Sequence, residues 1–113
     1  MNGLVESSAD ARSKTIGQNF RCRAWVNFNG TGTVAIRDSR NVSSITDNGT
    51  GDYTVNFTTD MPDANYSAVG SPNYARLFFG IRDIASGSVR FTSYDEGSTS
   101  YYDSLNTCVS IFR

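Results

Sequence analysis

The chain has 113 residues, of which 10 are basic and 11 acidic, so its net charge at neutral pH is −1. This length suits one domain, because it leaves too few residues for a second hydrophobic core. The balanced charge provides no long-range positive field to gather phosphate backbones, so we expect no nucleic-acid partner. No apolar run approaches the ~20 residues that a bilayer-spanning helix needs, and we expect no membrane insertion.

The composition also limits the chemistry of any site. The chain has no histidine and two cysteines, Cys22 and Cys108, which is too few ligands for a zinc site. We therefore expect no metal and no cofactor. Both cysteines fall in predicted strands near opposite ends of the domain, and we expect them to be buried and reduced rather than joined in a disulfide.

Residues 1–19 are polar, and Ser7, Ser8 and Ser13 interrupt any apolar stripe. Too few large apolar side chains are present to dock a helix without a partner chain. The sequence therefore predicts an N-terminal arm or linker over residues 1–19 and a folded domain over residues 20–113.

The next segment predicts a β-hairpin. Residues 21–28 and 33–37 alternate between apolar and polar side chains and flank Asn-Gly-Thr-Gly at 29–32. Asn-Gly supplies the positive φ angles that a tight turn requires. Because side chains alternate along a strand, Cys22, Ala24, Val26 and Phe28 share one face, which we assign to the core.

The next segment predicts a second β-hairpin. Residues 42–46 lead into a second Asn-Gly-Thr-Gly, at 48–51, after which Tyr53, Val55 and Phe57 point to one face. We interpret both motifs as hairpin turns and the whole of residues 21–57 as a β-meander. The oxygen-rich stretch 47–52 also suggests calcium, but it lacks the spacing of acidic ligands and the distal glutamate of the helix-loop-helix motif, and we prefer a plain turn.

Residues 22–71 resemble a segment that recurs in tail-fibre and other virion structural proteins of bacteriophages, particularly marine ones. Two motifs carry the resemblance, Trp-Val-Asn-Phe-Asn-Gly at 25–30 and Met-Pro-Asp-Ala-Asn-Tyr at 61–66. The resemblance implies a virion protein made in a bacterial cytoplasm, a distal fibre domain that forms a homotrimer, and contact with other virion proteins and with a host surface glycan or protein. It brings no catalytic residues, so we expect no enzyme.

Four more strands are predicted, at residues 66–69, 75–84, 88–94 and 105–112, separated by turn-forming stretches such as the proline-containing loop 59–65. About eight strands with short connections and no convincing long helix indicate an all-β fold. We expect an antiparallel β-sandwich, jelly-roll-like in character.

The loop at 93–103 combines aromatic and acidic side chains, which suits glycan binding, because aromatic faces stack on sugar C–H surfaces and carboxylates accept hydrogen bonds from hydroxyls. The alternative is a polar hairpin loop whose tyrosines pack on the edge of the sheet. Adjacent carboxylates here are poorly suited to act as the acid and base of a glycosidase, because neighbouring side chains diverge. The candidate ligand-binding residues are Tyr94, Asp95, Glu96, Tyr101, Tyr102 and Asp103.

A second group of aromatic and arginine side chains faces away from the predicted core. Arginine is enriched at interfaces and lysine depleted, and Lys14 is the single lysine of this chain. Two interpretations remain open: a subunit interface, or an inter-sheet core with arginines reaching to its edge. The candidate interface residues are Arg21, Arg23, Trp25, Arg37 and Phe78.

The sequence leads to two alternative hypotheses for the function. The first is adhesion of a tail-fibre tip to a host receptor. The second is a purely structural virion component, such as a capsid decoration or a fibre-capping module, that binds no receptor.

Overall fold

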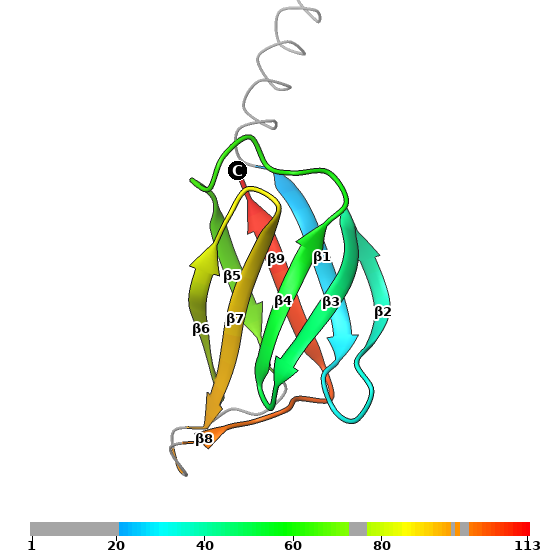
Figure 1. Cartoon of the computed structure of the whole chain (residues 1–113), viewed down its shortest axis with the longest axis vertical. Helices are drawn as coiled ribbons and strands as arrows, with labels where there is room; N and C mark the ends of the chain where they lie inside the picture. The colour runs from blue at the N-terminus through cyan, green and yellow to red at the C-terminus, as the bar shows by residue number, and fades with distance from the viewer. Residues whose placement is uncertain (1–20, 73–76, 96, 98–99) are drawn as a thin grey trace, which may run out of the picture.

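A computed structural model describes residues 21–72, 77–95, 97 and 100–113, and the predicted arm at 1–19 lies outside this range. The described residues form two antiparallel sheets that pack face to face (Figure 1). Sheet A has the strand order β2-β1-β9-β5, and sheet B has the order β3-β4-β7-β6, with β8 also paired to β7. The predicted antiparallel β-sandwich is confirmed.

The predicted alternation of buried and outward side chains holds in β1, β4 and β9, whereas β2 and β3 are largely exposed. The strands are β1 (Cys22–Asn29), β2 (Ala35–Arg40), β3 (Val42–Gly49), β4 (Asp52–Phe57), β5 (Ser67–Ser71), β6 (Leu77–Ile84), β7 (Ser88–Asp95), β8 (Ser100–Tyr101) and β9 (Thr107–Phe112). Strand β8 lies inside the segment that we had predicted to be a loop, and the other eight correspond to predicted strands.

Both Asn-Gly-Thr-Gly motifs lie at hairpins, as predicted, but the two hairpins belong to different sheets. Strand β1 pairs with β2 in sheet A, and β3 pairs with β4 in sheet B. The predicted meander is therefore wrong. The chain crosses between the sheets at Asn41, which adopts the left-handed region with φ of 56°. A single residue in this conformation turns the strand direction sharply, and asparagine tolerates it better than most residues.

The core lies between the sheets and is rich in aromatic rings. Phe28 of sheet A meets Tyr53 and Phe91 of sheet B edge-on, with ring centroids 5.2 and 6.1 Å apart. Phe79 stacks on Phe91 at 4.6 Å, and a Cβ at Gly70 would lie 2.1 Å from the Phe79 ring. Sheet A therefore needs a glycine where β5 approaches this ring. The buried apolar residues are Ala24, Val26, Phe28, Val42, Tyr53, Val55, Phe57, Met61, Leu77, Val89, Phe91, Val109 and Ile111.

The prediction that both cysteines are buried is wrong, because both are exposed and free. A register shift between Cys22 and Ala24 removes Cys22 from the inward row of β1. Cys108 alternates with the buried Thr107 and Val109 and so faces outward. Strands β1 and β9 are neighbours, but Cys108 lies opposite Asn27, several residues along β1 from Cys22.

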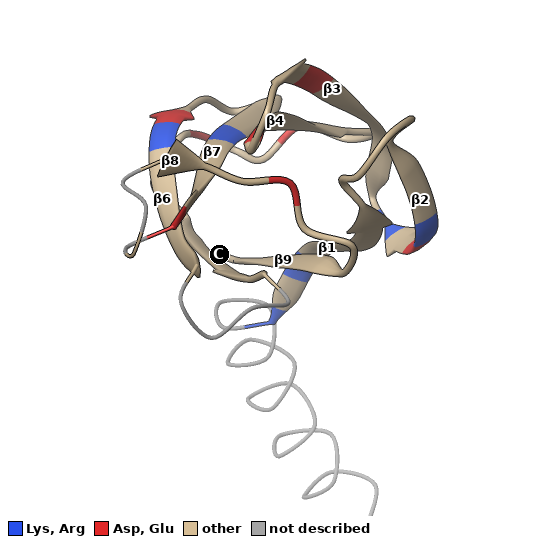
Figure 2. Ribbon diagram, turned by 90° about the horizontal axis from the view of Figure 1, so that it is seen from below, with Lys and Arg blue, Asp and Glu red and all other residues tan. Residues whose placement is uncertain are grey.

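The segment 102–106 closes one end of the sandwich. It crosses from β8 in sheet B to β9 in sheet A beneath the two sheets, as seen in Figures 1 and 2. The Gly30 N–H donates to the Ser104 carbonyl at 2.8 Å, and the Tyr102 N–H donates to the Ser93 carbonyl at 2.9 Å. These bonds tie the segment to both sheets and so fix the position of β8.

Candidate functional site

Three aromatic side chains lie in a row across the outer face of sheet B. Phe78 of β6 is opposite Tyr94 of β7, and Tyr101 of β8 is opposite Tyr94 on the other side. The rings of Tyr94 and Tyr101 meet edge-on with centroids 6.1 Å apart. Phe78 is 55% exposed and Tyr101 is 39% exposed. We call Phe78, Tyr94 and Tyr101 the aromatic strip.

A cation lies against one end of the aromatic strip. The guanidinium carbon of Arg82 is 5.6 Å from the centroid of the Tyr101 ring, and Nη2 of Arg82 donates a hydrogen bond to the Tyr101 hydroxyl. A guanidinium near an aromatic face is attracted by the electron-rich ring. The two side chains therefore hold one another, with the guanidinium of Arg82 over the Tyr101 ring.

Polar side chains continue the same face next to the aromatic strip. Arg90 donates two hydrogen bonds to Asp52, from Nε to Oδ1 at 2.9 Å and from Nη2 to Oδ2 at 2.6 Å. The hydrogen bond from Arg90 lowers the pKa of the Asp52 carboxyl below its ordinary value, against the opposing effect of burial. Asn48 donates to Thr54 Oγ1 at 2.8 Å, and Asn56 is bonded to hydroxyls of β3 in the same way.

The side chains of this outer face match the chemistry of a ligand that has both apolar and hydroxyl surfaces. Aromatic side chains supply apolar area with a polar tip, and amide, hydroxyl and guanidinium groups supply directional hydrogen bonds. A saccharide ring has that combination of surfaces. The described residues hold no group of three or more acidic, cysteine or histidine side chains placed to bind a metal ion.

The structure brings together two of the six predicted ligand-binding residues, Tyr94 and Tyr101. Tyr102 is exposed, and Asp95 accepts the Gly97 N–H at 2.8 Å within the turn. Asp103 points into the end of the sandwich instead, where Oδ1 accepts the Gly51 N–H at 2.8 Å. Glu96 lies outside the described residues.

Asp103 also contacts the buried hydroxyl of Tyr53, which lies 2.5 Å from Asp103 Oδ1 and 2.7 Å from the Gly30 carbonyl oxygen. Burial, followed by the hydrogen bond to Asp103, raises the pKa of Tyr53 far above its ordinary value. Tyr53 therefore stays neutral at physiological pH. This contact anchors the segment that follows β8, so that Asp103 has a positioning role for Tyr101.

Sequence reasoning missed the contributions of Phe78 and Arg82 to this face. Phe78 was predicted to face away from the core, but as part of a subunit interface. The missing information was the pairing of β6 with β7, which brings Phe78 beside Tyr94.

The predicted interface residues lie on two opposite faces of the sandwich. Trp25 is on the outer face of sheet A, opposite Arg40 of β2 and Ser110 of β9. Phe78 is on the outer face of sheet B, so that neither residue belongs to the inter-sheet core. Arg37 is exposed on β2, where Nη1 donates to Asn27 Oδ1 at 3.4 Å. In a cyclic trimer each subunit meets its two neighbours through different surfaces, so this placement leaves the interface prediction open.

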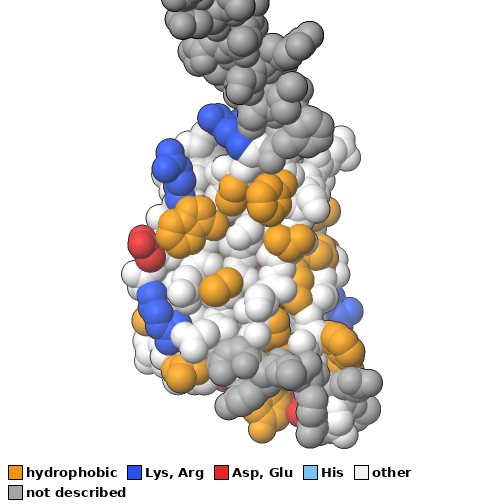
Figure 3. Space-filling view, turned by 180° about the vertical axis from the view of Figure 1, so that it is seen from behind, with side chains coloured by type: hydrophobic (Ala, Val, Ile, Leu, Met, Phe, Trp, Pro, Cys, Tyr) orange, Lys and Arg blue, Asp and Glu red, His pale blue; other side chains and the backbone are white. Residues whose placement is uncertain are grey.

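The outer face of sheet A also carries exposed apolar side chains. Phe112 is 39% exposed and Val69 is 51% exposed, on neighbouring strands β9 and β5. Figure 3 shows hydrophobic side chains scattered over this face and basic side chains along its margin. Arg21, Arg23 and Trp25 gather at one edge of it, around a pocket.

No protein-family model matches the chain, and no curated protein or solved structure is significantly similar to it. Among the described residues, no helix is long and apolar enough to cross a membrane.

Proposed function

We propose that this chain is a structural protein of a bacteriophage virion, the distal domain of a tail fibre, that attaches the virion to a glycan on the host cell surface. The resemblance of residues 22–71 to virion proteins supports the first part. The aromatic strip carries the second part, because large exposed aromatic side chains beside hydrogen-bonding groups are typical of a surface that binds a ligand.

The mechanism of attachment is avidity. A shallow outer face gives weak binding at one site, because little of the ligand is removed from water. A homotrimeric tip presents three copies of the aromatic strip, and linked sites raise the overall affinity without any new contact. The receptor-binding surface then needs no deep cleft.

The test is binding of the full chain to a glycan array, followed by competition with the virion for adsorption to host cells. Phe78→Ala and Tyr101→Ala each remove one ring of the aromatic strip, and we expect each to weaken glycan binding about tenfold. Phe112→Ala is the matched control, because it removes an exposed ring from the opposite sheet. We expect that variant to bind as the unmodified chain does.

Two outcomes would contradict the proposal. Absence of any bound glycan, with adsorption unaffected by the free chain, would favour a structural virion component without a receptor. Equal loss of binding in Phe78→Ala and Phe112→Ala would show that the aromatic strip is not the binding surface.

A further inference from the structure

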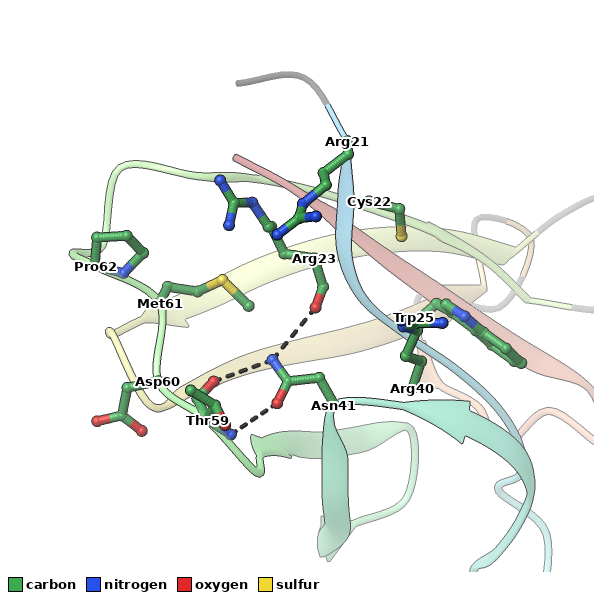
Figure 4. Close-up of a pocket in the computed structure, with 10 residues that line it drawn as sticks. All are labelled: Arg21, Cys22, Arg23, Trp25, Arg40, Asn41, Thr59, Asp60, Met61 and Pro62. Atoms are coloured by element: carbon green, nitrogen blue, oxygen red, sulfur yellow. Dashed lines mark hydrogen bonds between the residues drawn. The ribbon is translucent and has the colours of Figure 1, made fainter. Parts of the chain in front are cut away.

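A pocket of about 470 Å³ (Figure 4) opens at the end of the sandwich that lies opposite β8 in Figure 1. Its walls come from the start of β1, from the corner between β2 and β3, and from the loop that follows β4. The lining residues are Arg21, Cys22, Arg23, Trp25, Arg40, Asn41, Thr59, Asp60, Met61 and Pro62.

The side chain of Asn41 fixes these three walls relative to one another. Its Nδ2 donates to the carbonyl oxygens of Arg23 at 3.3 Å and Thr59 at 3.0 Å, and its Oδ1 accepts the Thr59 N–H at 2.7 Å (Figure 4). Met61 is 5% exposed, and its N–H donates to the Ser86 carbonyl at 2.8 Å. The pocket is thus part of the folded framework, and a ligand would meet walls that are already in place.

The charge of the pocket differs from that of the chain. Three arginines and one aspartate line it, whereas the whole chain carries a net charge of −1. Arg21 and Arg23 extend toward the loop after β4 in Figure 4. The Arg23 Nε donates to the Arg113 carbonyl oxygen at 3.1 Å. No ion pair joins Arg21 or Arg40 to a carboxylate of another described residue.

The indole of Trp25 lies beside the side chain of Arg40 (Figure 4). Trp25 is directly opposite Arg40 in the pairing of β1 with β2, and both side chains line the pocket. Arginine presents a planar fork of N–H donors that matches a carboxylate or sulfate group, and the indole presents a flat apolar face. The pocket therefore combines a site for an anionic group with an adjacent surface for a ring.

We propose that this pocket binds an acidic saccharide, with its carboxylate or sulfate group held by Arg21 and Arg40 and its sugar ring packed against Trp25. Carboxylated and sulfated saccharides share the feature that the pocket would recognise, which is an oxyanion next to an apolar ring face. This site is separate from the aromatic strip and does not depend on it, since Arg21, Arg40 and Trp25 lie at the opposite end of the sandwich from β8.

Trp25 is the single tryptophan of the chain, so its fluorescence reports on the pocket directly. The first probes are trigalacturonate and its methyl ester, which share a backbone and differ in charge. A sulfated carrageenan disaccharide and its desulfated form make the second pair. We expect each charged probe to change the fluorescence saturably, and each neutral form to bind about tenfold more weakly, as expected for loss of a charge-assisted contact.

Arginine variants locate the contact. We expect Arg21→Gln and Arg40→Gln each to weaken binding of the charged probe about tenfold. Arg37→Gln is the matched control, because it makes the same charge change on an exposed residue of the same sheet outside the pocket. Phe78→Ala should leave this binding unchanged, which separates a failure here from a failure of the aromatic strip.

Three results would overturn the proposal. The neutral forms could bind as tightly as the charged probes, or Arg37→Gln could reduce binding as much as Arg40→Gln does. A hexaglutamate peptide that binds as tightly as trigalacturonate would assign the pocket to acidic peptides instead. Comparison of the two probe pairs shows whether the pocket prefers carboxylate or sulfate.

Discussion

Replacement of Tyr53 by phenylalanine removes one oxygen atom from the closed end of the sandwich and leaves the aromatic packing intact. The Tyr53 side chain is fully buried, and its hydroxyl lies 2.5 Å from Asp103 Oδ1 and 2.7 Å from the Gly30 carbonyl oxygen. The ring contacts with Phe28 and Phe91 do not involve this oxygen. The variant therefore isolates the polar contribution of the contact.

The expected loss follows from what remains after the hydroxyl is gone. The Tyr53 hydroxyl has one proton to share between the Gly30 carbonyl and the Asp103 carboxylate, so its removal leaves one acceptor without a donor in a place that water reaches poorly, which costs about 1–3 kcal/mol of unfolding free energy. For a domain of this size such a loss corresponds to a fall in Tm of roughly 5–20 °C.

Urea unfolding followed by circular dichroism measures this change, and the slope of free energy against urea should not alter. Tyr101→Phe is the control, because it deletes the same atom from a residue that is 39% exposed, where a hydrogen bond contributes little. Our assignment of a structural role to the Tyr53 and Asp103 pair is refuted if the two variants have equal stability.

Further predictions concern acid, turn geometry and assembly. The pKa of Asp52 is lowered in the folded chain, so its contribution to stability is present above pH 3.8 and is lost as the pH falls further. When unfolding free energy is measured against pH, Asp52→Asn should lose less stability in acid than the unmodified chain does. An equal loss in acid would contradict this. Gly51→Ala should cost more than Gly32→Ala in urea unfolding. Both glycines have φ near 60°, but only at Gly51 would a Cβ meet backbone, at 2.5 Å from the Tyr102 nitrogen. Light scattering should give three times the chain mass of 12.3 kDa, whereas 12.3 kDa at every concentration would contradict the trimer.

Local patterns in the sequence were sufficient to predict the strands. Alternation placed Tyr53, Val55 and Phe57 on one face, and all three are buried. The two Asn-Gly-Thr-Gly motifs correctly indicated hairpins, although in the first copy the positive φ falls on Gly32 rather than on the Asn-Gly pair. Such features depend on neighbours within a few residues, which a sequence pattern records.

Features that depend on pairing between distant strands could not be predicted in this way. The chain crosses between the sheets at Asn41 because β2 and β3 pair with strands of different sheets. The polar residues around Asn41 would fit equally well in a turn between two paired strands of a meander, so the sequence does not distinguish the two topologies. For the same reason Tyr94 and Phe78 were assigned to different groups, although they are cross-strand neighbours. The exposure of Cys22 depends on a register shift that alternation cannot show.

The two exposed thiols give the chain its own chemical reporters. Cys22 lines the arginine-rich pocket, whereas Cys108 lies on the neighbouring strand outside it, and both are free. Alkylation with a small maleimide therefore labels one position that a pocket ligand would shield and a second that it would leave open. The ratio of the labelling rates of Cys22 and Cys108 therefore reports the occupancy of the pocket within a single sample, without any engineered residue.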